Sequence, residues 1–340
     1  MKFLINYITI LFLVLLISNC ETSKSDFSNE FKEGEEKLKN EDYESALVIF
    51  NQILTEDPKN INAYKKKITA LNELGHFNEA KIAVNDLFQI DSTDLESIKL
   101  RMKVNYYTNN FIAAIYDMDK ILEKNQSDTL VLKLRAIINF QLGNYEKSNS
   151  DVDKLLRLTP NDPVLYSLKG MYLLDLGLIE EAKENFNRSL EIFDQDAIVY
   201  CNLGSIEENF EKSVNYFNTA IKINPQYADS YFFLGERFMK NEMYKDAILN
   251  FNKAIDLNYS NQFASYYNRA YSKLNYGDYR GAIKDYEKVI EIDNTIAEAF
   301  LLLGSAKYQI DDLDGACKAW HKSFDLGNPS AIEFISNYCK

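Results

Sequence analysis

The 340-residue sequence has little that would interrupt helices, since it contains only 5 prolines and 12 glycines. It also lacks sustained alternation between apolar and polar residues, the pattern typical of half-buried strands. Apolar residues instead return every three or four positions, and they make up 46% of the chain. These two absences exclude a fold built on β-sheets. They predict an all-α protein with enough apolar surface for a continuous core.

The sequence has no excess of positive charge, because 38 Lys and Arg face 51 Asp and Glu and the formal net charge is −13. A nucleic-acid partner requires a basic footprint for its phosphates. Docking on an anionic membrane through surface charge requires one too. The acidic balance argues against both, and we expect no nucleic-acid binding.

Histidine is nearly absent, and His76 and His321 are the only two. Neither has a cysteine or a second histidine at the spacing of a metal site. The sequence shows no phosphate-binding glycine loop between a strand and a helix, and no nucleophile elbow. We therefore expect no metal, no cofactor and no catalytic activity.

One corner motif recurs along the chain. Gly277 is suited to end one helix, and Tyr279, Ala282 and Tyr286 then share one face of the next. Further corners of this kind begin at Gly75, Gly143 and Gly177. The chain is therefore predicted to be an array of helix–turn–helix units.

The spacing of these corners resembles the tetratricopeptide repeat family, whose units of about 34 residues each form two helices. The unit at residues 263–296 carries the family pattern through Tyr266, Ala270, Gly277, Tyr279, Ala282 and Tyr286. On this pattern the array covers residues 27–330, in units 27–60, 61–94, 95–128, 129–162, 163–196, 197–227, 228–262, 263–296 and 297–330. The resemblance implies an all-α, right-handed α-solenoid of about nine units, with a capping helix at 331–340 over its last apolar edge.

Four units depart from the regular pattern. The sixth is three residues short, with a clipped corner near Glu207–Phe210, and the seventh has one extra residue around Tyr259–Gln262. The third has a weakly patterned first helix. The ninth has Asp311 where the corner glycine is expected.

Residues 1–19 are typical of a secretory signal, with Lys2, a short apolar run and a small polar end. The end of this segment, Ile17-Ser18-Asn19-Cys20, resembles the lipobox of bacterial lipoproteins, in which the cysteine is lipidated. The resemblance implies a lipid on Cys20, a tether at 20–26 and an exported protein anchored in the bacterial envelope, periplasmic or at the outer membrane. A plain cleaved signal and an uncleaved anchor are the alternatives.

Three cysteines remain besides Cys20. Cys317 and Cys339 could form a disulfide that holds the terminal helix outside the cytoplasm, or they could be two packed thiols. Cys201 is expected to be a small buried residue.

In the tetratricopeptide repeat family the first helix of each unit lines a concave groove, here called the inner face. Carried onto this chain, the inner positions of units two to four hold Lys65, Lys66, Lys99, Lys103 and Lys133. Adjacent ammonium groups would attract a carboxylate-rich segment or a phosphate. The alternative is that they are ordinary solvated lysines.

The inner positions of units seven to nine are mostly aromatic. They hold Phe232, Phe233, Tyr267, Asn268, Tyr271 and Tyr308. Aromatic side chains at a groove wall suit an extended or helical apolar peptide. The alternative is that they belong to the core.

The resemblance implies a non-enzymatic adaptor that holds partner proteins or peptides in its groove while a lipid keeps it at the membrane, in envelope complex assembly. A soluble periplasmic or secreted scaffold is the alternative. An accessory subunit of an envelope enzyme complex is a third hypothesis.

Overall fold

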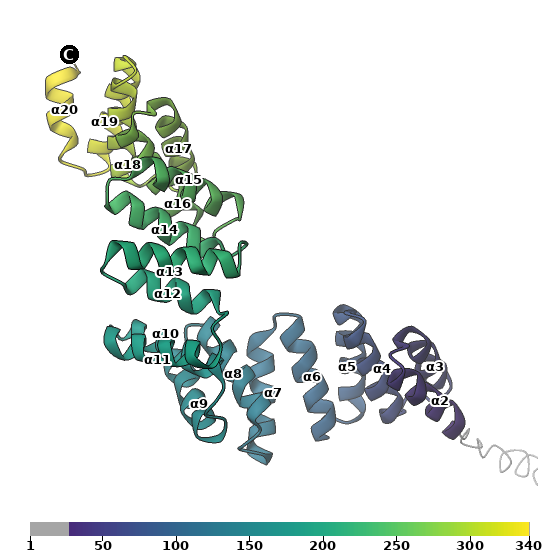
Figure 1. Cartoon of the computed structure of the whole chain (residues 1–340). Coiled ribbons are helices and arrows are strands. Elements are labelled where there is room, and N and C mark those ends of the chain that lie inside the picture. Colours follow the sequence, from purple (N-terminus) through teal and green to yellow (C-terminus); the bar gives the residue numbers. More distant parts are fainter. Residues whose placement is uncertain (1–26, 340) are drawn as a thin grey trace, which may run out of the picture. The chain divides into compact units, whose positions relative to one another are not determined.

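The computed structural model describes residues 27–339, and this part of the chain contains 19 helices and no strand (Figure 1). The first nine are α2 (Ser28–Lys39), α3 (Tyr43–Glu56), α4 (Ile61–Glu73), α5 (Phe77–Ile90), α6 (Leu95–Tyr107), α7 (Phe111–Lys124), α8 (Thr129–Gln141), α9 (Tyr145–Leu158) and α10 (Pro163–Asp175). The others are α11 (Ile179–Ile192), α12 (Ala197–Ile206), α13 (Phe210–Ile223), α14 (Ala228–Lys240), α15 (Tyr244–Asp256), α16 (Gln262–Tyr276), α17 (Tyr279–Ile292), α18 (Ala297–Tyr308), α19 (Leu313–Asp325) and α20 (Ala331–Tyr338). The predicted all-α repeat solenoid is confirmed.

In eight of the nine repeats the corner between the two helices has a left-handed backbone, the sixth being the exception. Glycine occupies this place at Gly75, Gly143, Gly177 and Gly277, with φ of 75°, 74°, 74° and 94°. Four other corners reach φ between 56° and 64° without glycine, at Glu41, Asn109, Glu242 and Asp311. The ninth corner, weak in sequence, therefore takes the same geometry. Packing of the two helices holds the turn even where glycine does not ease it.

First helices usually begin behind a capping side chain. Asp94, Asp128 and Asp196 each accept a hydrogen bond from a backbone N–H in the first turn of α6, α8 and α12. These caps satisfy donors that the helix itself leaves unpaired.

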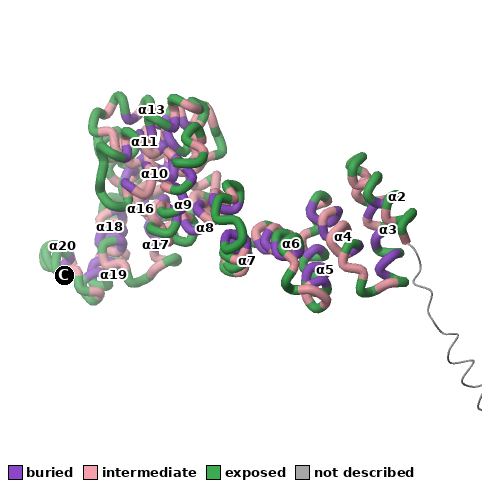
Figure 2. Tube along the Cα trace, turned by 90° about the horizontal axis from the view of Figure 1, so that it is seen from below, coloured by how far each residue is buried: buried purple, intermediate pink, exposed green. Residues whose placement is uncertain are grey.

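The two helices of a unit pack where a small residue on the first faces a ring on the second. A Cβ added to Gly170 would lie 2.6 Å from the ring of Phe186, and one on Gly304 would lie 2.4 Å from the indole of Trp320. Phe186 and Trp320 are fully buried. Figure 2 shows the resulting pattern, in which each helix has a buried side towards its neighbours and an exposed side.

The irregular units follow their sequences. The sixth has a ten-residue first helix, α12, and the second helix α13 begins at Phe210. The third, despite its weak pattern, has a full 13-residue helix, α6. Packing against neighbouring helices stabilises this helix, although the apolar periodicity of its own sequence is weak.

Contacts divide the chain into two compact units, with the boundary between Asp151 and Val152 inside α9. In the first unit, Phe50 and Ile68 lie in core clusters formed by α2 to α6. In the second unit, successive clusters run from α10 to α20 and include Phe217, Tyr286 and Trp320. Each unit therefore has its own chain of cores.

The terminal helix α20 covers the end of α19. Cys317 of α19 and Cys339 are joined by a disulfide with Cα atoms 5.6 Å apart, the pairing that the sequence left open. The indole of Trp320 stacks on Phe334 of α20, with ring centroids 5.1 Å apart. The apolar edge of the last unit is thus closed by α20.

No helix between residues 27 and 339 is long and apolar enough to cross a membrane. The predicted signal at 1–19 and the lipidation at Cys20 lie outside the described residues.

Candidate functional site

The inner-face lysines lie in the first compact unit, which ends at Asp151, and four of them form ion pairs with carboxylates of that compact unit. The ion pairs, with their N–O distances, are Lys65–Asp94 (2.9 Å), Lys65–Glu96 (2.8 Å), Lys66–Glu35 (2.7 Å), Lys99–Asp128 (3.7 Å) and Lys103–Glu73 (2.9 Å). Lys133 occupies the equivalent place on α8. These ion pairs offset the charges of four of the five lysines, although Lys66, Lys99 and Lys103 stay partly exposed. The stripe as a contact surface for a partner stays a prediction.

Lys65 shows how this pairing works. Burial lowers the pKa of its ammonium, but hydrogen bonds to Glu96 and Asp94 outweigh burial and raise it. The same bond lowers the pKa of the Asp94 carboxyl. Asp94 is the N-cap residue of α6 and Glu96 lies in the first turn of that helix, so Lys65 on α4 links the first helices of two successive repeats rather than offering a free charge.

One predicted aromatic groove residue, Phe232, lies in the core, and Phe233 packs beside it. Phe232 is only 5% exposed and stacks on Tyr259 with centroids 4.3 Å apart, so it belongs to the core. Phe233 is half-buried and meets the edge of Phe232 at 5.4 Å. The groove prediction for Phe232 is wrong because its helix turns that position towards α15, where Phe251 packs on it.

Tyr308 lies at the covered end of the array. Its ring is 4.7 Å from Tyr338 of α20 and 5.9 Å from Trp320. The capping helix therefore packs against one side of Tyr308, which remains 38% exposed.

The other three predicted residues come together. Tyr267, Asn268 and Tyr271 of α16 line a pocket of about 400 Å³. The remaining lining residues are Met239, Lys240, Glu242 and Tyr244, from the end of α14 and the start of α15. The pocket therefore lies between the inner helices of two successive units, and Tyr271 remains 37% exposed.

Glu236 is the carboxylate beside this pocket that the sequence reading missed. The amide Nδ2 of Asn268 donates to Glu236 Oε1 at 3.2 Å. Burial raises the pKa of Glu236, although Lys240 and Asn268 act in the opposite direction. The sequence could have indicated Glu236, because it lies one turn after Phe232 on the first helix of the seventh repeat. Residues on one face of a helix recur at that spacing.

Each of three repeats also contains a buried Arg–Asp pair that was not predicted from the sequence. Arg101–Asp117, Arg135–Asp151 and Arg269–Asp285 are each separated by 16 residues and join the two helices of one unit. Each arginine reaches both carboxylate oxygens of its partner. The repeated separation was visible in the sequence. These pairs are structural, since both partners face each other inside the unit.

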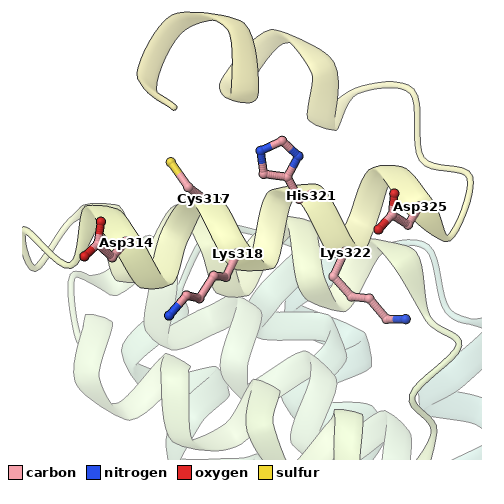
Figure 3. A pocket seen from close by; sticks show the side chains of 6 residues that line it. All are labelled: Asp314, Cys317, Lys318, His321, Lys322 and Asp325. Atoms are coloured by element: carbon pink, nitrogen blue, oxygen red, sulfur yellow. The ribbon is translucent and has the colours of Figure 1, made fainter. Parts of the chain in front are cut away.

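A second hollow, of about 690 Å³, lies along α19 beside α20 (Figure 3). Its lining residues are Asp314, Cys317, Lys318, His321, Lys322 and Asp325, all from one helix. Cys317 is already in the disulfide, and residues 27–339 contain no group of His, Cys, Asp and Glu that could hold a metal. The imidazole Nδ1 of His76 lies 3.5 Å from Glu79 in the next turn, on the surface. Neither histidine is part of a reactive arrangement.

Family models described as tetratricopeptide repeat match residues 37–100, and also 164–196, 197–227 and 263–296. Human serine/threonine-protein phosphatase 5 is 29% identical over 85 residues, which are 25% of this chain and 17% of that protein. The chain spans less than a third of the length of the curated relatives that it matches.

Two solved structures show the same fold. Pseudomonas aeruginosa PilF aligns with a TM-score of 0.53 and 19% identity, covering 61% of this chain and 96% of PilF. YrrB aligns with a TM-score of 0.50 and 20% identity, covering 54% of this chain and 97% of YrrB. With repeat models matching in both units, and the paired helices and left-handed corners of that repeat along the array, the chain belongs to the tetratricopeptide repeat family.

Proposed function

We propose that this protein is a non-enzymatic adaptor that binds polypeptide segments on the inner helices of its second compact unit, which begins at Val152. The observation that carries the proposal is the pocket between α14 and α16, where Tyr267, Asn268 and Tyr271 meet. Tetratricopeptide repeats generally serve as interaction modules, and function on such a fold must be argued from the site.

The chemistry of the pocket suits a peptide. The rings of Tyr267 and Tyr271 provide rigid contact area with little side-chain entropy to lose. Asn268 places an amide beside them, and amide groups can pair with peptide backbone. YrrB is described as having an unusual peptide-binding site, and a peptide ligand here is consistent with that fold relative.

The test is a selection of 12-residue peptides from a random phage-displayed library on the full-length chain in detergent. Binding of each selected peptide is then measured by fluorescence anisotropy. We expect Tyr271→Ala to weaken binding at least about tenfold, or about 1.4 kcal/mol. Tyr276→Ala is the matched control, because Tyr276 is exposed on the same helix outside the pocket. Selected peptides that bind the two variants equally, with helicity intact, would show that the pocket is not the binding site.

We also propose that Cys20 carries acyl chains that hold the adaptor at an envelope membrane, where it assists complex assembly. The support is the sequence of residues 1–20, an apolar run that ends at a cysteine. Cys20→Ala should move the protein from the membrane to the soluble fraction and abolish labelling by a radioactive fatty acid. Cys201→Ala, at a buried thiol, is the control. Membrane retention of Cys20→Ala would favour an uncleaved anchor, and a soluble, unlabelled wild-type protein would favour an exported soluble scaffold.

A further inference from the structure

The pocket of the second unit is bordered by carboxylates without a contacting cation. Glu242 lines it, Glu236 is bonded to its Asn268, and Glu298 lies on α18, the next inner helix. None of the three forms an ion pair with any residue of the described chain. Glu298 accepts one hydrogen bond, from Asn328 Nδ2 at 2.9 Å. In the first compact unit, by contrast, four inner-face lysines are paired with carboxylates.

The cations on the same helices are occupied elsewhere. Arg237 donates to the carbonyls of Gly204 and Glu207, and Arg269 and Lys273 both pair with Asp285. On α18, Lys307 faces Glu287 at 3.9 Å. Lys240 is the one cation among the lining residues, against Glu242 in the lining and Glu236 bonded to the lining residue Asn268.

An unsatisfied hydroxyl lies beneath the same surface. Tyr286 is fully buried and its Oη has no hydrogen-bond partner among the described residues. Its ring meets Tyr267 edge-on, with centroids 6.0 Å apart. Burial raises the pKa of Tyr286, and the nearby Tyr267, Tyr271 and Glu298 raise it further. A buried polar group without a partner costs stability, so this hydroxyl destabilises the packing beneath the pocket.

Charge and ring chemistry together select the ligand. An ammonium or guanidinium group gains from a partly desolvated carboxylate and from the face of a tyrosine ring. An acidic segment would be repelled, and a purely apolar one would leave the carboxylates desolvated without compensation. We infer that this pocket takes the side chain of a Lys or Arg in a bound polypeptide, with Glu236 and Glu242 flanking the cation and Tyr267 and Tyr271 lining its path. The inference rests on the proposed peptide-binding function and names the chemistry of the partner.

The experiment uses the peptides selected on the full-length chain. We expect them to be enriched in Lys and Arg, and replacing the critical Lys or Arg of one peptide by Gln should weaken its binding at least about tenfold. Glu236→Gln should weaken binding about fivefold or more, because it removes the charge but keeps the oxygen that accepts from Asn268. Glu211→Gln, an exposed position on α13, makes the same charge change away from the pocket and should have no effect.

Tyr286→Phe is the control for a structural change beneath the pocket. It removes only a buried, unpaired hydroxyl that does not line the pocket, so the free energy of unfolding should be unchanged or increased and peptide binding should be unchanged. Peptides that depend on Tyr271 but not on Lys or Arg, and that bind Glu236→Gln like wild type, would overturn this inference and leave the adaptor function standing. A library that yields no peptide sensitive to Tyr271→Ala would overturn both.

Discussion

At the scale of single residues, Cys201 is a thiol whose surroundings suppress its chemistry. It is 3% exposed in the core cluster of α12 to α14. Burial raises the pKa of its thiol from 9.0 to about 12. A thiolate is the reactive form of cysteine, so Cys201 is a packing residue and not a nucleophile.

The same burial predicts a loss of stability in alkaline solution. Between pH 9 and about 12 the thiol ionises in the unfolded chain but stays protonated in the folded one. The folded state then binds more protons, so stability that is fully present below pH 9 falls by up to about 1.4 kcal/mol per pH unit for this group. Cys201→Ala should show a shallower decline in urea unfolding between pH 8.5 and 10.5. Equal slopes for the two proteins would contradict the assignment.

At the scale of elements, a buried ion pair ties the two helices of a repeat. The side chain of Asp285 on α17 is 5% exposed and receives Arg269 at 2.6 Å and Lys273 at 2.8 Å from α16. Removing one member of such a group leaves charges that are buried without a partner.

Asp285→Ala should therefore lower the free energy of unfolding by about 3–5 kcal/mol. Glu291→Ala is the matched control on the same helix, since its pair with Lys288 is exposed and should cost less than about 1 kcal/mol. Urea unfolding followed by circular dichroism measures both. A similar, small change in the two variants would show that the Asp285 network contributes little.

The terminal helix is the element held by covalent as well as apolar contacts. The disulfide joins residues separated by 22 positions, and closing a loop of that length restricts the unfolded chain by about 3 kcal/mol. Changing both Cys317 and Cys339 to Ser should speed amide hydrogen exchange in α20 far more than in α16. Unchanged exchange in α20 would mean that the packing of Trp320 against Phe334 holds it alone.

At the scale of the whole molecule, the contacts within each compact unit are made between helices that lie close together in the sequence. The proposed pocket and its carboxylates lie in the second unit, within α14 to α18. A fragment of residues 163–339, which begins with α10, should fold to a helical state and keep the affinity of the full chain for the selected peptides. A helical fragment that no longer binds would show that the first unit contributes to the site.

Part of this architecture could be predicted from the sequence alone. The recurring corners predicted the helix pairs, the short sixth unit and the terminal helix, because left-handed turns and helical periodicity are local properties of the chain. The candidate site was only partly predictable. Tyr267, Asn268 and Tyr271 do meet at a pocket, whereas Phe232 is core and four inner lysines are paired.

The sequence by itself determined the repeat, its helices and the acidic character of the protein, since these depend on spacing and composition. Only the tertiary structure decided which inner residues stay accessible and which charges remain unpaired. Exposure and pairing depend on the neighbouring unit, which places Glu96 against Lys65 but leaves Glu236 with an amide. The spacing within one repeat cannot specify what the next repeat sets opposite it, and the character of the groove depends on that packing.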